Sequence, residues 1–245
     1  LTKHILLYDK FPFFDFIKLF FVPFDVVIDT EQSHYFSAIV AFLTKARIRC
    51  GFNTNERGYL FTHKVSYRHQ DYEAESFLSL FFSLTDERVS FDHERPLFSL
   101  DDRCLVWARE RLANLKGKKS IAIIPGASIP ERRWPLFNYA TVVKWLIEQQ
   151  INVVFCGGKQ DNAPPLDTKK ESIKEYVLNL IGETSLLETA GIIAVSDLYL
   201  SSDTGILHLA RGLGTPTVSL FGPGITMKWA PRGKKHAVIV KQVPC

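Results

Sequence analysis

From residue 120 onward, short apolar runs rich in β-branched residues alternate with segments of helical periodicity. Strands are expected at 121–124, 151–156, 177–181 and 198–200, in the apolar run that follows Pro216, and at 237–241. The helical signals between strands are clear. Apolar residues recur with helical spacing from Phe137 to Ile147, between the first two strands, and Ser185 and Glu188, after the third strand, have the spacing of a capping box. Such alternation is typical of a parallel sheet covered by helices on both faces, so the sequence predicts an α/β fold.

The first half of the chain is also α/β, but more irregular. Strands are expected at 5–8, 25–29, 47–50 and 60–65, and helices at 33–45 and 72–84. The polar segment from Asn114 to Lys119 contains a single glycine and is the best place for a domain boundary. We therefore predict an N-terminal α/β domain over residues 1–116 and a C-terminal Rossmann-like domain over residues 117–245.

One segment of the second half combines a turn with a helix start. Asp203, Thr204 and Gly205 follow an apolar run and should lie at a helix N-terminus, with His208 one turn later. Free backbone N–H groups and the helix dipole favour a phosphate group there, and a glycine lets a ligand approach the backbone closely. The simpler alternative is that Asp203 or Thr204 only caps the helix.

Two further loops carry polar residues beyond the carboxyl ends of predicted strands, where open parallel sheets bind ligands. The loop 125–135 holds Ser128, Arg132 and Arg133, and a guanidinium beside small residues suits a diphosphate because it can pair two oxygens. Asp161 follows Gly157-Gly158 and could accept hydrogen bonds from a ribose. Alternatively, the arginines are solvated loop charges and Asp161 belongs to an ordinary turn. Together the three loops predict a nucleotide-diphosphate pocket.

Several function classes are disfavoured by composition and motifs. The sequence has neither a G-x-x-x-x-G-K-[ST] loop nor a G-x-G-x-x-G fingerprint, which weakens phosphoryl transfer from ATP and dehydrogenase chemistry. A net charge of +4 gives no argument for nucleic-acid binding. The four cysteines are far apart and include no C-x-x-C pair, so neither a disulfide framework nor a zinc site is expected, and a reducing cytoplasm is the simplest compartment.

The most apolar segment, residues 11–28, is interrupted by prolines and charged residues, so we expect no membrane-spanning helix there. Its phenylalanines, from Phe13 to Phe24, could contact a membrane surface, although aromatic residues at helical spacing more often belong to a core. The chain begins with Leu1, and its only methionine is Met227. We therefore expect the sequence to be part of a longer protein.

The same loops carry a resemblance to a known family. The P-G-A-x-x-x-x-R-R-W-P segment (125–135), the Gly-Gly turn (157–158), G-x-T-S-L (182–186), D-T-G-x-x-H (203–208) and L-F-G-P (220–223) occur in this order in glycosyltransferase family 9. That family includes the ADP-heptose:lipopolysaccharide heptosyltransferases. The similarity is specific over residues 120–231 and weaker before them, where residues 24–29 and 49–52 resemble the family's acceptor domain.

The resemblance implies a GT-B enzyme with two Rossmann-like domains facing a cleft. It implies inverting transfer of heptose or a related sugar from a nucleotide diphosphate donor such as ADP-heptose, with no obligatory metal. The acceptor would be a lipopolysaccharide core or a similar lipid-linked saccharide, in the bacterial cytoplasm or at the inner membrane. Its implied donor ligands are Ser128 and Arg132 for the diphosphate, Asp161 for the nucleoside, and Asp203, Thr204, Gly205 and His208 for the phosphate and sugar.

The sequence departs from the family pattern at several places. No segment matches the first strand and Asp-bearing loop of the family, so the general base is unassigned and the N-terminal domain is expected to lack its first strands. Arg132 stands where Lys is common, Gly224-Ile225 where Thr-Asp is frequent, and Arg211-Gly212 where small apolar residues are usual. A nucleotide-sugar-binding protein without catalysis, or a GT-B epimerase or hydrolase, are the alternatives to a transferase.

Overall fold

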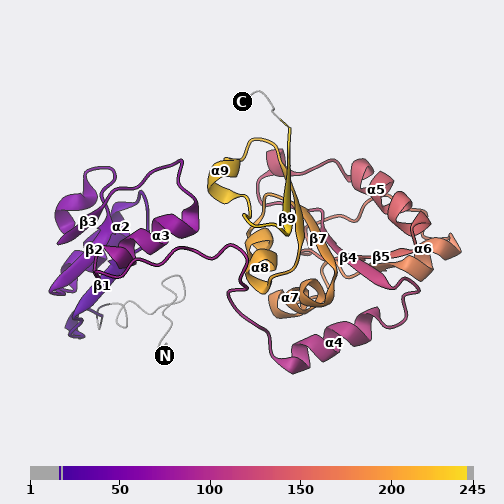
Figure 1. The fold of residues 1–245 in the computed structure, drawn as a ribbon, viewed down its shortest axis with the longest axis horizontal. Coiled ribbons are helices and arrows are strands. Elements are labelled where there is room, and N and C mark those ends of the chain that lie inside the picture. The colour runs from indigo at the N-terminus through magenta and orange to yellow at the C-terminus, as the bar shows by residue number, and fades with distance from the viewer. Residues whose placement is uncertain (1–16, 18, 242–245) are drawn as a thin grey trace. The chain divides into compact units, whose positions relative to one another are not determined.

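A computed structural model describes residue 17 and residues 19–241, and the strand expected at residues 5–8 lies outside them. The chain forms two compact units, Leu1–Phe91 and Asp92–Cys245, which we call unit 1 and unit 2; Figure 1 labels their elements. Both units are α/β, and every strand pair in them is parallel among the described residues. The fold class predicted from the sequence is confirmed.

Unit 1 contains a three-stranded sheet in the order β1-β2-β3. Its described elements are η2 (Leu19–Phe21), β1 (Val26–Asp29), α2 (Tyr35–Leu43), β2 (Ile48–Phe52), η3 (Arg57–Leu60), β3 (His63–Val65) and α3 (Glu73–Phe82). The strand predicted at 60–65 begins later, at His63. The reason is that Leu60 ends a 3₁₀ turn, and it packs with Phe61 against the buried face of α2.

A buried ion pair fastens the loop after β1 in unit 1. Arg57 has no exposed surface and donates to Asp29 Oδ2 at 2.9 Å and to the carbonyl oxygens of Glu31 and His34. Asp29 also accepts from the Ser37 hydroxyl. Burial raises the pKa of Asp29, and these partners oppose the shift. The pair thereby joins the carboxyl end of β1 to the turn at η3.

Unit 2 contains a six-stranded sheet in the order β6-β5-β4-β7-β8-β9. The strands are β4 (Lys119–Ile124), β5 (Ile151–Phe155), β6 (Val177–Asn179), β7 (Leu198–Ser202), β8 (Thr217–Phe221) and β9 (His236–Val240). The helices are α4 (Asp102–Leu112), α5 (Leu136–Glu148), α6 (Glu171–Tyr176), α7 (Leu186–Val195), α8 (Gly205–Leu213) and α9 (Thr226–Trp229), with a 3₁₀ turn, η4, at Pro130–Arg132. The predicted capping box is present at the start of α7.

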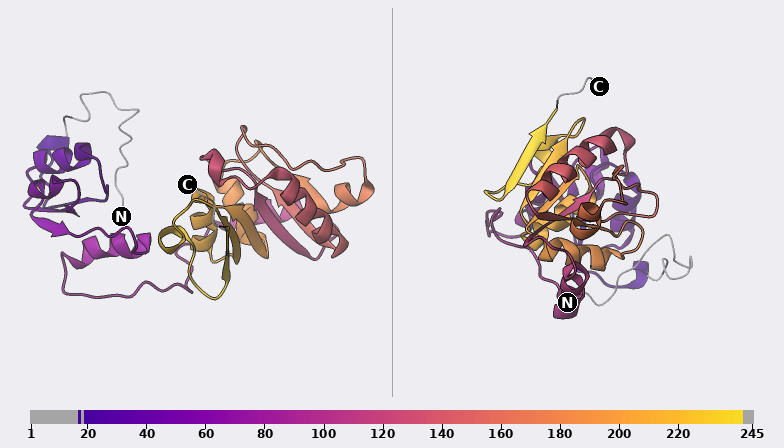
Figure 2. Two further views of the ribbon diagram at one scale, coloured as in Figure 1. Left: turned by 90° about the horizontal axis from the view of Figure 1, so that it is seen from above. Right: turned by 90° about the vertical axis from the view of Figure 1, so that its right-hand side faces the viewer.

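Helices lie on both faces of this sheet, as the right-hand view of Figure 2 shows for α5 and α7. Alternate residues of β4 point to opposite faces. Ile121 and Ile123 pack with α5 in one core cluster. Ala122 and Ile124 belong to a second cluster that α4, α7 and α8 share. Burial from both sides explains why this strand is a continuous apolar run in the sequence.

The strand order of unit 2 reverses beside β4. The chain runs outward from β4 to β5 and β6, and then returns to β7 on the other side of β4 before it continues to β8 and β9. The helices that follow β4 and β7 therefore lie on opposite faces of the sheet. The connections diverge at the carboxyl ends of these two strands, which is where open α/β sheets form their ligand crevice.

Residues 92–98, which we call the strap, bind the C-terminal end of α8. The buried Arg211 donates to two carbonyl oxygens of the strap at 2.9 and 3.3 Å. Leu97 N–H donates to Gly212 O at 2.7 Å. A side chain at Gly212 would collide with Phe98, whose ring lies 2.4 Å from an ideal Cβ. The strap is therefore built into unit 2.

The units divide between Phe91 and Asp92, and not after residue 116 as the polar composition of residues 114–119 suggests. Besides the strap, α4 packs on α7, with Ala108 fully buried in their shared core. The polar segment is a connection inside unit 2, where Lys116 forms an ion pair with Glu175. The polar composition of residues 114–119 reflects an exposed connection, but an exposed connection need not be a domain boundary.

We expect Arg211→Met to loosen the strap and to destabilise unit 2 by about 2 kcal/mol, because hydrogen bonds from a charged donor contribute about 1.5–3 kcal/mol. Thermal unfolding and limited chymotrypsin digestion measure this, with faster cleavage expected at Leu97 and Phe98. The exposed Arg109→Met is the matched control and should change neither. If the strap of Arg211→Met resists chymotrypsin as well as the wild type does, Arg211 does not hold the strap.

Candidate functional site

The crevice at the strand reversal lies between two loops. β4 and β7 are neighbours, with Ile124 opposite Ser201 in the register. The chain leaves β4 through loop 125–135, which contains η4, and it leaves β7 through Asp203 and Thr204 into α8. Because the strands are parallel, both loops emerge at the same edge of the sheet. The loops that carry Arg132 and Asp203 therefore lie at one edge of the sheet.

Arg132 and Asp203 form an ion pair across the crevice. Arg132 Nη1 lies 3.1 Å from Asp203 Oδ2, although the angle is not that of a hydrogen bond and Oδ2 has no hydrogen-bond partner among the described residues. Asp203 is buried, whereas 30% of the Arg132 side chain is exposed. A guanidinium has five N–H donors, so Arg132 can bind an anion from solvent while it stays beside Asp203.

Burial raises the pKa of Asp203, and the charges of Arg132 and His208 oppose the shift only in part. His208 stands edge-on to Trp229 of α9, with ring centroids 5.9 Å apart. Although its surface is partly open to solvent, the surrounding protein lowers the pKa of His208, and Asp203 opposes this shift. The site therefore combines one cation, a carboxylate that is costly to ionise, and an imidazole that favours its neutral form.

Helix α8 begins without a side-chain cap, because Thr204 at the N-cap makes no cap hydrogen bond. The Thr204 hydroxyl is buried and close enough to Tyr199 to lower the pKa of that phenol, against the larger raising effect of burial, but no hydrogen bond of normal geometry joins them. An ideal Cβ on Gly205 meets no described atom within 4 Å. A capping role for the Thr204 side chain is thus contradicted, and Gly205 faces open space.

The loop after β8 also reaches Asp203, which the sequence did not indicate. An ideal Cβ on Gly224 would lie 2.6 Å from Asp203 Oδ2. The absence of a side chain at Gly224 therefore lets this loop pass next to the carboxylate. The available signal was Gly224 itself, which stands where the family frequently has Thr.

Two residues of loop 125–135 have different roles from Arg132. Arg133 donates from Nε to Ala127 O at 2.7 Å, so it closes the loop on itself. Ser128 is exposed in the same loop. The structure therefore places Ser128 at the surface beside the crevice, and it makes Arg132 the arginine that faces Asp203.

Asp161 is held in a turn next to the crevice. Its Oδ2 accepts from Gly158 N–H at 2.8 Å, and its own N–H donates to Gly158 O at 3.0 Å. An ideal Cβ on Gly126 would lie 2.1 Å from Asp161 Oδ1, so the carboxylate also packs against the loop after β4. The turn role considered for Asp161 is therefore present.

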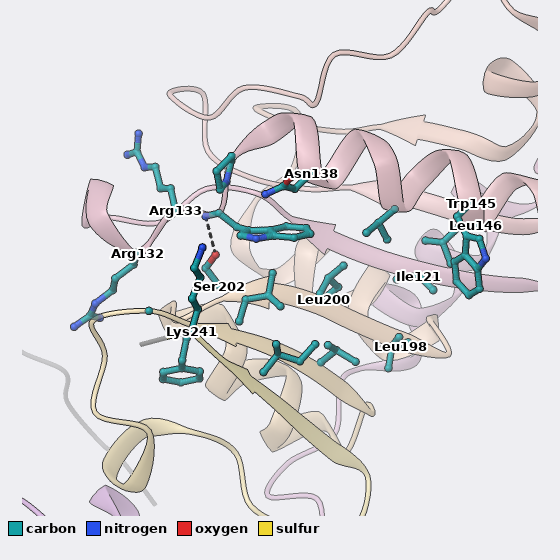
Figure 3. A pocket seen from close by; sticks show the side chains of 18 of the residues that line it. Ile121, Arg132, Arg133, Asn138, Trp145, Leu146, Leu198, Leu200, Ser202 and Lys241 are labelled. Carbon is teal, nitrogen blue, oxygen red and sulfur yellow. Dashed lines mark hydrogen bonds between the residues drawn. The ribbon is translucent and has the colours of Figure 1, made fainter. Parts of the chain in front are cut away.

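Unit 2 also contains a mostly apolar groove of about 720 Å³. Figure 3 shows its floor on β4 and β7, with Ile121, Leu198 and Leu200, and its wall on α5, with Trp145 and Leu146. Only one end is polar, where Arg132, Arg133, Ser202 and Lys241 lie. The groove shares Arg132 with the crevice, but its lining does not include Asp203, Gly205 or His208.

Other predictions concern metals and membranes. Among the described residues, no three His, Cys, Asp or Glu side chains are grouped so as to bind a metal ion. In residues 17 and 19–241, every helix is too short or too polar to cross a membrane. Of the phenylalanines considered for membrane contact, Phe21 is exposed, whereas Phe13 and Phe16 lie outside the described residues.

Comparison with known proteins identifies the family. Residues 18–245 match glycosyltransferase family 9 (heptosyltransferase). The chain belongs to this family. A family 9 relative, lipooligosaccharide heptosyltransferase 2 of Haemophilus ducreyi, is 25% identical over 234 residues, which make up 90% of this chain and 66% of that protein. Lipopolysaccharide heptosyltransferase 2 of Escherichia coli is 32% identical over 126 residues, 49% of this chain and 35% of that protein. The chain thus spans less than two thirds of the length of these curated relatives.

Solved family 9 structures share the fold. The E. coli ADP-heptose lipopolysaccharide heptosyltransferase II matches with a TM-score of 0.70 at 22% identity, over 91% of this chain and 70% of that one. E. coli heptosyltransferase WaaC, solved with ADP, matches with a TM-score of 0.63 at 20% identity, over 92% and 69%. The likeness confirms the GT-B type of fold, with a small N-terminal sheet.

We expect Asp203→Asn to stabilise this family 9 chain at neutral pH. The pKa of Asp203 is raised above its ordinary 3.8 in the folded state, so the folded protein holds this proton more tightly than the unfolded chain does. Ionisation therefore destabilises the fold as the pH rises from 3.8 through the raised pKa. The gain in melting temperature should be absent below about pH 4 and complete above the raised pKa.

Thermal unfolding at stepwise pH values measures this gain, with the exposed Asp25→Asn as control. A gain that is independent of pH, or one that appears only in acid, would show that burial of the charge is not the cause.

Proposed function

We propose that this family 9 chain is a sugar transferase that moves heptose or a related sugar from ADP-heptose to a lipopolysaccharide core or a similar lipid-linked saccharide. The observation that supports it is the convergence of Arg132, Asp203 and the uncapped N-terminus of α8 at one edge of the sheet. The relatives' names supply the sugar and the acceptor class.

The donor diphosphate would lie between Arg132 and the first turn of α8. The backbone N–H groups there and the positive end of the helix dipole bind phosphate oxygens, and Gly205 leaves room for close approach. Arg132 adds a second set of donors. Ser128, on the same loop as Arg132, and Asp161, in the neighbouring turn, are the further ligands that we assign to the diphosphate and the nucleoside.

The reaction would be an inverting displacement. The acceptor hydroxyl attacks the anomeric carbon on the side opposite to the diphosphate, the new C–O bond forms, and the bond to the β-phosphate oxygen breaks with its electron pair remaining on that oxygen. Arg132 and the α8 N-terminus stabilise the charge that develops there. The hydroxyl proton passes to a general base, a role for which the resemblance assigns no residue of this chain.

The sugar itself would be held by Asp203 and His208. A carboxylate accepts hydrogen bonds from sugar hydroxyls, and a neutral imidazole can donate one and accept one. We place the reaction in the cytoplasm, at or near the inner membrane that carries the lipid-linked acceptor. Free thiols at Cys50, Cys104 and Cys156 are consistent with a reducing compartment.

The direct test incubates the chain with ADP-heptose, with and without a lipid-linked core saccharide, and follows products by mass spectrometry. A glycan extended by one heptose, formed only when acceptor is present, supports the transferase. Release of free heptose or an epimer without acceptor would identify a hydrolase or an epimerase. ADP-heptose binding without any product would identify a binding protein and contradict the proposal.

Replacing Arg132 should weaken binding of ADP. Charge-assisted hydrogen bonds contribute about 1.5–3 kcal/mol, so Arg132→Ala should raise the Kd about 10- to 100-fold by calorimetry. The Kd of Arg132→Lys for ADP should lie between those of Arg132→Ala and the wild type, because an ammonium keeps the charge but not the planar fork. The exposed Lys144→Ala is the control. Equal Kd values for Arg132→Ala and wild type would remove Arg132 from the site.

Gly205→Ala tests the open space at the start of α8. The added methyl meets no described atom within 4 Å, and alanine favours a helix by about 1 kcal/mol over glycine, so the melting temperature should hold or rise. ADP affinity should nevertheless fall about tenfold or more, because the methyl occupies space that we assign to the phosphate. A variant that binds ADP like the wild type would show that the diphosphate lies elsewhere.

A further inference from the structure

Ser202, the last residue of β7, links the two loops of the donor site. Its side chain is fully buried, and its Oγ accepts the N–H of Trp134 at 3.3 Å; this is the dashed line that ends on Ser202 in Figure 3. Trp134 follows closely after Arg132, and Asp203 follows Ser202 directly. One hydroxyl therefore ties the backbone beside the arginine to the backbone beside the carboxylate.

Tyr139 of α5 contacts the same hydroxyl. Its phenol oxygen lies 3.4 Å from Ser202 Oγ, and its buried ring stands edge-on to Trp134 with centroids 4.9 Å apart. Burial raises the pKa of Tyr139, and the contact with Ser202 opposes the shift. Both distances to Ser202 Oγ are long for hydrogen bonds. The hydroxyl thus sits between the loop and α5 and is shared by both.

The remaining hydrogen bonds that the structure describes in this loop do not reach β7. Arg133 Nε binds Ala127 O, and the N–H groups of Arg132 and Arg133 bind carbonyls of the same turn. The ion pair of Arg132 with Asp203 does cross the crevice, but it ends on a flexible side chain. Among the described contacts, Ser202 alone provides a hydrogen bond from β7 to the loop backbone.

We infer that Ser202 is a positioning residue, assisted by Tyr139, that sets the separation between Arg132 and the N-terminus of α8. The inference rests on the proposed function, because it assumes that both elements bind one diphosphate. A guanidinium on a loosely held loop samples many positions, and binding must then order the loop as well as the ligand. The hydroxyl of Ser202 removes part of that ordering before the donor arrives.

The experiment compares four single variants in the whole chain for their Kd toward ADP and for thermal unfolding. Ser202→Ala removes both contacts and should raise the Kd about fivefold, as expected for the loss of one net hydrogen bond. Ser202→Thr retains the hydroxyl and should bind ADP within about twofold of wild type. Tyr139→Phe keeps the hydrogen bond between Ser202 and Trp134, so its Kd for ADP should lie between those of Ser202→Ala and Ser202→Thr.

The fourth variant is the matched control. Ser219→Ala removes another fully buried serine of the same sheet, whose Oγ donates to Ala237 O at 3.2 Å in strand β9. It should lower the melting temperature about as much as Ser202→Ala does, with no change in Kd. A role of Ser202 that is merely structural would give the same result for both serines.

A double-mutant cycle with Arg132→Ala separates positioning from other effects. In the Arg132→Ala background, Ser202→Ala should change the Kd less than about twofold, because no guanidinium is left to position. If the two effects multiply, Ser202 does not act through Arg132 and the inference fails. If Ser202→Ala binds ADP like wild type while Arg132→Ala does not, the inference fails and the donor site stands. If ADP does not bind the wild-type chain, the proposed function itself fails.

Discussion

The pairing of β4 with β7 is the contact on which the candidate site depends. These strands are far apart in the sequence, and their alignment brings the loop with Arg132 within 3.1 Å of Asp203. The helices that follow them pack on opposite faces of the sheet, so the two loops diverge and leave a crevice between them. A one-residue change of this register would exchange the faces of the strand and dissolve the arrangement.

The ion pair in the crevice also constrains how a donor can bind. Arg132 already forms an ion pair with Asp203, so in the donor complex that we propose a diphosphate would share the guanidinium with a buried carboxylate. Two anions next to each other repel unless a cation lies between them. Repulsion is therefore lowest when Arg132 lies between the two anions. The phosphates would then bind Arg132 and the N–H groups of α8, and the sugar hydroxyls would bind Asp203. This division assigns affinity to one side of Arg132 and sugar selection to the other.

The sequence predicted the strands of unit 2, and it singled out the loops of the candidate site, because both produce local signals. Continuous apolar runs mark strands that are buried on both faces, and Asp203-Thr204-Gly205 follows such a run directly. Helix α4 was not predicted, although Asp101 caps it; its surface is largely charged, and its burial comes from α7. Ser202 and Gly224 could not be found either, since their roles depend on neighbours from other loops. A serine or a glycine has the same local signal in a turn as in a site.

Helix α8 explains one of the departures from the family pattern. Its N-terminus lies at the candidate site, and its C-terminus holds the strap through Arg211 and Gly212. Small apolar residues at these two positions could not supply the guanidinium, and any side chain at position 212 would displace Phe98. The substitutions therefore belong to the attachment of residues 92–98 and do not touch the donor ligands. Because α8 spans Gly205–Leu213, the strap attaches to the end of the helix that lies away from the candidate site.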